Sequence, residues 1–471
     1  VSKEKEAAMK LNIGMVSTRF AGLDGVSLEA AKWTEVLEEM GHCCYWLAGE
    51  LDRPARRSIL VPEAHFQSDV NRWISRQIFD RRRRSPQVLA AIHDQRTILR
   101  FHLEQFIDRF RIDCLIVENA LSIPMQIPLG LALTEIIAER TIPAILHHHD
   151  FYWERPRYAH NTVADYMQSA FPPSLPSAMH VVINSIAREQ LARRCQQLAT
   201  LIPNVLDFSR PPDVDRTVQR KSLRTMGIHP EDIVILQPTR IVQRKGIEHA
   251  VDLVHKLNLP NCKLIVSHAA GDEGMTYAHW LKRYAARHQV DLKFLDIQTR
   301  PPTENNPGFF HQYRALWELY ERSDFVTFPS LTEGFGNALL EAIYFRKPLL
   351  VNRYDTFVKD IEPLDFDLVT IDGVLTRRHV ETVRHLLSCP ERLDQMTAHN
   401  YEIARQHFSY QQVRSRLQVI LETARTTIPP ARSEGARPSP KTIIPLKPLE
   451  KQTAPSPDYN TIKSGKSGRR G

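Results

Sequence analysis

The sequence has no apolar run of the roughly 20 residues that a membrane-spanning helix requires. Residues 127–137 come nearest to one, but Glu135 interrupts them. Residues 1–16 carry too many charges ahead of their short apolar stretch to resemble a secretory leader, and that stretch is typical of a first strand. We therefore expect no transmembrane segment.

Cysteine is scarce and widely spaced. The chain has six cysteines and no CxxC pair, which argues against both a zinc ribbon and a disulfide framework. Hydrophobic residues make up 42% of the chain and charged residues 25%, the balance of a soluble globular protein. These features predict a cytoplasmic location.

Acidic residues are outnumbered mainly at the C-terminal end. Residues 426–471 hold nine Lys or Arg against three Asp or Glu, so this segment carries +6 of the net charge of +8. Its eight prolines and lack of apolar periodicity predict a disordered tail. The tail leaves peripheral membrane contact open and raises an alternative function, that of a basic nucleic-acid or membrane-surface binding protein. Because the rest of the chain keeps only +2, we favour no nucleic-acid partner.

Arginine is concentrated in residues 53–111, where thirteen arginines accompany six acidic residues. Arg81–Arg84 form an unbroken run. We interpret this run as a solvated helical face, because charge runs usually lie in water. The alternative is a patch for a phosphorylated acceptor or an acidic lipid.

The length predicts two domains. Strand patterns alternate with helical patterns in two series, and the proline-containing polar segment 203–215 separates them. This rhythm is typical of parallel β/α units with right-handed crossovers, which gives an α/β fold with two doubly wound, Rossmann-like halves. We expect domains at residues 9–205 and 206–425, with the final helices crossing back to the first domain, and the tail at 426–471.

The segment "PSLTEGFGNALLEAIYFRKPLLV" combines a strand end, a glycine turn and a helix start. Gly334 and Gly336 permit close approach of the backbone, and the N–H groups at a helix N-terminus attract phosphate. Glu333 precedes the helix, whereas Glu341 lies within it, so the two carboxylates can reach different parts of one extended ligand. The pattern predicts a site for anionic oxygens.

A second segment, "LQPTRIVQRKGIEHA", places two cations beside another helix start. Arg240 offers a planar fork and Lys245 a point charge, and together they suit a diphosphate. An ordinary exposed loop is the alternative for this segment taken alone.

The stretch "HHHDFYWERP" follows directly on a buried-strand pattern, so its titratable groups belong at the carboxyl end of a sheet. His147 and His149 share a face by strand alternation and could ligate zinc with a third group, although no H-E-x-x-H pattern or cysteine partner accompanies them. Strand-end histidines satisfied by backbone hydrogen bonds are the second alternative.

Other residues are expected near the same edge of the sheet. Gly25 belongs where the first helix begins, and Glu118 and Asn119 follow the strand pattern "CLIV". Trp153 and Arg155 suit an acceptor, since an aromatic ring packs on a sugar and arginine binds a carboxylate or phosphate.

The string "EGFGNALLE" resembles the E-x7-E signature of the retaining GT-B glycosyltransferases of family 4, the glycosyl transferases group 1. R-x4-K-G from Arg240 to Gly246, "IPNVLD" at the domain junction and the Gly/Asp loop after the first strand resemble the same family in order and spacing. The resemblance extends from about residue 11 to residue 425 and implies a GT-B fold, in which two Rossmann-like domains face each other across a cleft.

The resemblance also implies roles for residues. The N-terminal domain would bind the acceptor and the C-terminal domain a nucleotide-diphosphate sugar, UDP- or GDP-linked, from which a hexose passes to a small polar or phosphorylated acceptor with retention of configuration. Glu341 would bind the ribose. The catalytic residues would be His149, Asp150 and Glu333; the diphosphate-binding residues Arg240, Lys245, Gly334, Phe335, Gly336 and Asn337; and the acceptor or cleft residues Gly25, Asn119, Trp153 and Arg155.

No cofactor and no metal are implied, since the nucleotide sugar is a co-substrate and fixed cations stabilise its leaving group. The D-x-D strings at Asp213 and Asp365 lie in the linker and after a proline-containing turn, not at a convincing metal site. A GT-B sugar phosphorylase that uses inorganic phosphate is the alternative within this fold. The base, the hexose, the acceptor and the oligomeric state stay open.

Overall fold

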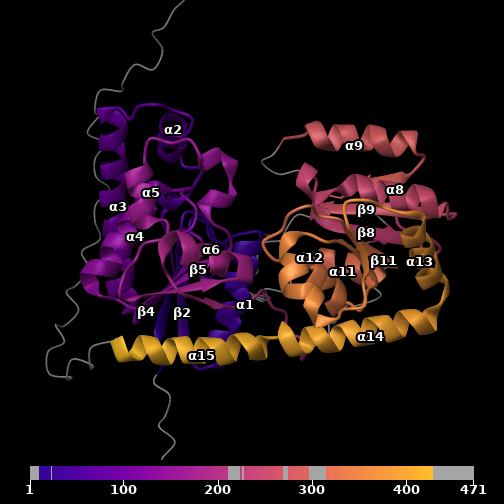
Figure 1. Cartoon of the computed structure of the whole chain (residues 1–471). Coiled ribbons are helices and arrows are strands. Elements are labelled where there is room, and N and C mark those ends of the chain that lie inside the picture. Colours follow the sequence, from indigo (N-terminus) through magenta and orange to yellow (C-terminus); the bar gives the residue numbers. More distant parts are fainter. Residues whose placement is uncertain are drawn as a thin grey trace, which may run out of the picture. The chain divides into compact units, whose positions relative to one another are not determined.

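The computed structural model describes residues 10–22, 24–210, 223–224, 227–268, 274–295 and 314–427 (Figure 1). Within these ranges the chain forms two parallel β-sheets, each flanked by helices. This arrangement confirms the predicted α/β class with two doubly wound sheets. The predicted disorder of the tail falls, beyond residue 427, outside the described residues.

The first sheet has seven parallel strands in the order β3-β2-β1-β4-β5-β6-β7. Its strands are β1 (Asn12–Val16), β2 (Cys43–Ala48), β3 (Ser58–Leu60), β4 (Cys114–Glu118), β5 (Ala144–His148), β6 (Ala178–Val182) and β7 (Ala199–Leu201). The α-helices among them are α1 (Gly25–Glu39), α2 (Asp69–Ile78), α3 (Pro86–Phe110), α4 (Ile127–Arg140), α5 (Ala164–Ala170) and α6 (Ser185–Cys195).

The second sheet has six parallel strands in the order β10-β9-β8-β11-β12-β13. Its strands are β8 (Ile233–Arg240), β9 (Cys262–His268), β10 (Asp291–Phe294), β11 (Phe325–Phe328), β12 (Leu349–Asn352) and β13 (Val369–Ile371). The described α-helices of this part are α8 (Ile247–Leu257), α9 (Thr276–Arg287), α11 (Arg314–Arg322), α12 (Asn337–Tyr344), α13 (Arg377–Ser388), α14 (Pro390–His407) and α15 (Tyr410–Thr427).

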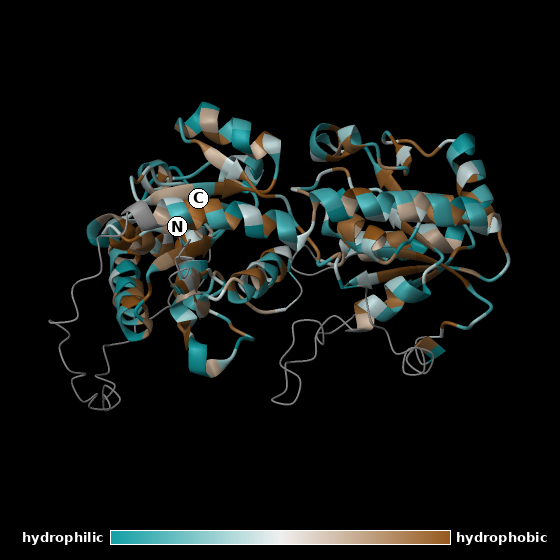
Figure 2. Cartoon of the chain, turned by 90° about the horizontal axis from the view of Figure 1, so that it is seen from below, coloured by the Kyte–Doolittle hydropathy of each residue, from teal (hydrophilic) through white to brown (hydrophobic). Residues whose placement is uncertain are grey.

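Burial on both faces explains why the central strands are continuous apolar runs. Each sheet has one hydrophobic cluster on either side, and hydrophobic colour concentrates in the strands and in the helix faces that cover them (Figure 2). Helix α1 begins where Asp24 accepts hydrogen bonds from the backbone N–H groups of Val26 and Ser27, which satisfies two donors of its first turn.

The last helix belongs to the first core. Val413 and Leu417 of α15 are fully buried in the same cluster as Trp33 of α1. The Tyr410 hydroxyl donates to Glu35 at 2.9 Å, which fixes the start of α15 on α1. The chain therefore returns to the first sheet after completing the second.

Both sheets reverse their strand order at a defined point. The order changes direction between β1 and β4 in the first sheet and between β8 and β11 in the second. In doubly wound sheets, ligands bind outside the carboxyl ends of the strands at such a switch point. The segments that follow these four strands are therefore where a site is expected.

Two details differ from the sequence-based expectation. Arg81–Arg84 lie between α2 and α3 and not on a helical face, because Asp80 has a left-handed φ of 54° and Ser85 caps a helix that Pro86 begins. Three short edge strands, β3, β7 and β13, were not expected. All six cysteines are free. In the described part of the chain, no helix combines the length and hydropathy needed to cross a membrane.

Candidate active site

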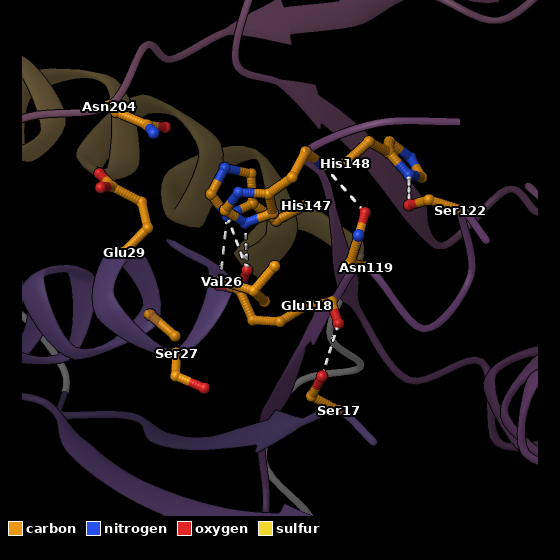
Figure 3. Close-up of polar contacts among 12 residues, drawn as sticks. Ser17, Val26, Ser27, Glu29, Glu118, Asn119, Ser122, His147, His148 and Asn204 are labelled. Atoms are coloured by element: carbon orange, nitrogen blue, oxygen red, sulfur yellow. Dashed lines mark hydrogen bonds and ion pairs between the residues drawn. The ribbon is translucent and has the colours of Figure 1, made fainter. Parts of the chain in front are cut away.

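A buried cluster of one carboxylate and two imidazoles lies at the carboxyl ends of β4 and β5 (Figure 3). The sheet register pairs Glu118 with His147 directly, and His149 follows on the same side. Glu118 Oε2 lies 2.9 Å from His147 Nδ1 and 3.0 Å from His149 Nε2. His147 stacks on Trp33 of α1, with ring centroids 4.1 Å apart, so both histidines are held in place.

The pKa values of this cluster depend on burial and on the contacts that both imidazoles make with the Glu118 carboxylate. Burial acts to raise the pKa of Glu118, but its contacts with His147 and His149 outweigh burial and hold that pKa at about 2. Burial lowers the pKa of His147. Burial acts on His149 in the same direction, but its hydrogen bond to Glu118 prevails and raises its pKa. The cluster therefore combines an ionised carboxylate with one readily protonated imidazole.

One potential metal-ligand atom from each of these three residues lies within 4.8 Å of the other two, so the geometry would also suit a metal ion. Strand alternation correctly placed His147 and His149 on one face. The third group, Glu118, comes from the neighbouring strand, and the sequence placed it only near the same edge of the sheet.

His148 points to the opposite face of the sheet. Its Nδ1 contacts the Ser122 hydroxyl, and its Nε2 lies 2.9 Å from His180 Nδ1. Burial lowers the pKa of His148 well below its usual value and lowers that of His180 to about 4. Both rings are therefore neutral in the folded protein near pH 7.

This pair predicts a loss of stability in acid. Because the unfolded histidines titrate near pH 6.5 and the folded ones lower, the stability they confer is present above pH 6.5 and falls as the pH drops toward 4. At pH 5 the loss is roughly 2 kcal/mol for His180 alone. Chemical denaturation at pH 7 and pH 5 measures it, and His180→Phe should reduce the difference. An equal difference in the variant would contradict this account.

Asp150 and Asn119 join the ends of β5 and β4. Asn119 has a left-handed φ of 59°; its Nδ2 donates to Asp150 Oδ1 at 2.9 Å, and its Oδ1 accepts from the backbone N–H of His149 at 3.1 Å. Arg155 forms an ion pair with Asp150. Trp153 is half-buried and stacks on Phe151, with ring centroids 4.4 Å apart.

Lys245 and Glu333 form a nearly buried ion pair between the segments that follow β8 and β11, and each side chain is 11% exposed. Burial lowers the pKa of Lys245, and Glu333 opposes that effect. Arg244 Nη1 lies 3.6 Å from Glu333 Oε2. Arg240 is exposed and has no ion-pair partner among the described residues. The structure thus brings the predicted Lys245 and Glu333 into contact, while Arg240 acts on this pair only by helping to lower the pKa of Lys245.

The glycine turn after β11 is shaped by close packing. Gly336 has φ of 119°, and a Cβ there would lie 2.5 Å from the Tyr354 hydroxyl. The Phe335 carbonyl accepts from that same hydroxyl. Helix α12 then begins at Asn337 without a side-chain cap, which leaves its first N–H groups for other acceptors.

Several contacts join this turn to residues of the first sheet. Asn184 Nδ2 donates to the Gly334 carbonyl at 2.7 Å, and a Cβ on Gly334 would lie 3.1 Å from the His149 carbonyl. Asn204 Nδ2 donates to Asn337 Oδ1 at 2.6 Å. A Cβ on Gly25 would lie 3.5 Å from Asn337 Nδ2. The structure therefore brings the predicted residues of both halves into contact.

Glu341 lies on α12 beside Tyr320, whose hydroxyl donates to Glu341 Oε2 at 2.7 Å. Burial raises the pKa of Glu341, while Tyr320 and Lys32 act to lower it. Lys32 of α1 is itself bonded to the buried Glu29 at 2.8 Å. Sequence reasoning missed Lys32, Glu29 and Asn184; for Asn184 the signal was its place between a strand pattern and a helix start.

Comparison with known proteins identifies the family. Residues 218–403 match the family described as Glycosyl transferases group 1. Over 446 residues the chain is 31% identical to a mannosylglucosylglycerate synthase of Thermotoga maritima, a match that covers 86% of this chain and 98% of that protein. The chain belongs to the group 1 glycosyltransferases. A mannosylglucosylglycerate synthase of Petrotoga mobilis is 30% identical over 385 residues, covering 77% of this chain and 86% of the relative.

The fold of this glycosyltransferase is shared with solved structures of low sequence identity. Sucrose-phosphate synthase from Thermosynechococcus elongatus aligns with a TM-score of 0.61 at 12% identity, covering 88% of this chain and 100% of that one. Anabaena HepE in complex with UDP-glucose aligns with a TM-score of 0.60 at 12% identity and the same coverage. These likenesses confirm the GT-B fold.

The family also confirms the predicted enzyme class, so the chain is a glycosyltransferase with a nucleotide-sugar donor. The roles of individual residues stay predictions.

Proposed function

We propose that this glycosyltransferase moves a hexosyl group from a UDP- or GDP-linked sugar to a small acidic acceptor of the glycosylglycerate type, with retention and without a metal ion. The observation that carries the proposal is the Lys245–Glu333 ion pair, next to Gly334, where an added Cβ would lie 3.1 Å from the His149 carbonyl. A diphosphate and the sugar attached to it need a cation and a carboxylate at such neighbouring positions.

The donor end of the proposal rests on charge. Breaking the bond between the anomeric carbon and the phosphate oxygen places negative charge on the leaving diphosphate. Lys245, Arg240 and the uncapped start of α12 supply fixed positive charge there, which makes a metal ion unnecessary. Glu333 would then hold the hydroxyl groups of the sugar, and Glu341 those of the ribose.

The acceptor end of the proposal rests on the relatives' names, since both are mannosylglucosylglycerate synthases. Glycerate carries a carboxylate, and Arg155 is the cation paired with Asp150, which follows His149 in the chain. A cavity of about 490 Å³ beside the end of β2 suits this carboxylate less, because Glu50, Glu63 and Asp69 line it. We therefore assign the binding of the acceptor's carboxylate to Arg155. The acceptor oxygen would form its new bond on the face that the diphosphate leaves, and its proton would pass to the diphosphate.

Nucleotide binding gives the direct test of the donor site. With EDTA present, UDP or GDP, but not ADP, should raise the melting temperature of the full chain, because a ligand that binds only the folded state stabilises it. Glu341→Ala should abolish that rise. Tyr320→Phe is the matched control, since it removes the same hydrogen bond but keeps the carboxylate, and it should keep the rise. If both variants respond like the wild type, Glu341 does not bind the ribose.

A GT-B phosphorylase would keep the same cations for inorganic phosphate. For such an enzyme, phosphate or a disaccharide would raise the melting temperature, and no nucleotide would change it. That result would replace the proposed donor.

A further inference from the structure

Glu118 is fully buried, yet its carboxylate faces two imidazoles and, among the described residues, forms no ion pair with arginine or lysine. His149 Nε2 is engaged with Glu118, whereas His149 Nδ1 has no hydrogen-bond partner among the described residues. His149 keeps 8% of its surface exposed, and His147 keeps none. One nitrogen of His149 is thus tied inward, and the other is available to a ligand.

We propose that Glu118 is the positioning residue of the transfer site, fixing the His149 ring with Nε2 protonated and presenting Nδ1 to the bound sugar. This inference rests on the proposed function, which places His149 at the donor sugar. The hydrogen bond made by one imidazole nitrogen decides which tautomer the ring adopts, so a carboxylate at Nε2 makes Nδ1 the ligand-facing atom.

The position of Nδ1 has a chemical consequence. In the neutral ring Nδ1 accepts a hydrogen bond from a sugar hydroxyl, and in the protonated ring it donates one to an oxyanion. Glu118 favours the protonated ring, because its charge lies 3.0 Å from Nε2. A ring held in one orientation also loses less entropy on binding its ligand.

His147 completes the arrangement. It stacks on Trp33 and donates to the same carboxylate from Nδ1, which stops Glu118 from rotating away from His149. The N···O distances of 2.9 to 3.2 Å are those of hydrogen bonds, and an ionised carboxylate accepts both. Hydrogen bonds alone therefore account for both contacts of the carboxylate, so we favour positioning over metal binding, although His147 Nε2 is buried without a hydrogen-bond partner among the described residues.

The charged and titratable groups around His149 come from three directions. Glu118 faces it from β4, His147 from β5 and Glu29 from α1, while Asp150 follows it in the chain. Glu29 is neutralised by Lys32, and Asp150 by Arg155. Glu118 is thus the acidic neighbour whose removal should lower the pKa of His149 most.

The experiment compares hexosyl transfer by wild type and Glu118→Gln over pH 5.5 to 9. Glutamine keeps the shape but cannot balance a protonated imidazole, so kcat should fall by roughly 100-fold. The KM of the donor should change less than about threefold. The limb of the kcat profile that follows the titration of His149 should move to lower pH, because Glu118 no longer raises the pKa of that ring. Equal kcat and an unmoved profile would overturn the proposal.

Ser122→Ala is the matched control. It removes a buried partner of His148 on the other face of the same sheet edge, so it should leave the profile unmoved. An equal shift in this variant would show a general loss of packing and overturn the inference. A metal found in the wild type and lost in Glu118→Gln, with activity restored by that metal, would also overturn it.

A double-mutant cycle tests whether Glu118 acts through His149. In a His149→Ala background, Glu118→Gln should cost less than about threefold further in kcat. A full additional 100-fold loss would contradict the inference. If Glu118→Gln fails to fold, Glu118→Asp takes its place; it keeps the charge but withdraws it from His149 Nε2, so a smaller fall in kcat and a smaller shift of the profile in the same direction are expected. Wild-type activity throughout the series would overturn the proposal. A wild type that transfers no hexose from any nucleotide sugar would instead refute the proposed function.

Discussion

Replacing Lys245 by methionine is expected to lower kcat/KM for hexosyl transfer by roughly 1,000-fold, the effect of removing a fixed charge from a developing oxyanion. Methionine keeps most of the side-chain volume but removes the charge beside Glu333. Steady-state kinetics with the preferred nucleotide sugar measure the loss. Lys282→Met is the control, because Lys282 is an exposed lysine on α9 and should keep full activity.

The loss at Lys245 must be separated from instability, since Glu333 would be left nearly buried without a partner. The double variant Lys245→Met, Glu333→Gln removes both charges and should recover thermal stability, while transfer stays low. Recovery of both stability and transfer would show that the ion pair is structural only.

The second large effect is expected at Gly336. Alanine there would adopt a φ of 119°, and its Cβ would lie 2.5 Å from the Tyr354 hydroxyl and 3.0 Å from the Phe328 ring. Backbone strain and overpacking together should lower the free energy of unfolding by roughly 3 kcal/mol. The displaced turn should also abolish nucleotide binding. Chemical denaturation and the nucleotide-dependent melting shift measure the two effects.

Gly373→Ala is the control for Gly336→Ala. Gly373 also has a positive φ, 67°, but no atom lies within 4 Å of its added Cβ. It should lose only about 1 kcal/mol from strain and keep nucleotide binding. Equal losses at both glycines would mean that conformation alone, and not the packing of the turn, sets the effect.

The strand and helix rhythm was predictable because central strands of parallel sheets are buried on both faces and appear as apolar runs. The edge strands β3, β7 and β13 were not, since each has three residues and is defined only by its neighbour. The GT-B fold and the enzyme class followed from the two motif segments, whose spacing resembles the family.

Parts of the candidate site depend on sheet order, which local patterns do not contain. The ion pair of Lys245 and Glu333 joins residues 88 positions apart that meet only because β8 and β11 are neighbours. Glu118 meets His147 and His149 through the register of β4 and β5. Strand alternation predicted that the two histidines share a face, but their common carboxylate required the fold.

The most direct measurement of the central claim is acceptor-dependent release of nucleoside diphosphate. The full chain is incubated in EDTA with UDP-glucose or GDP-mannose and with glucosylglycerate, and mass spectrometry quantifies both products. The account predicts equimolar nucleoside diphosphate and glycosylated acceptor with one donor, and formation of both products slowed roughly 1,000-fold in Lys245→Met. Consumption of neither donor, or formation of a sugar phosphate that requires only inorganic phosphate, would contradict it.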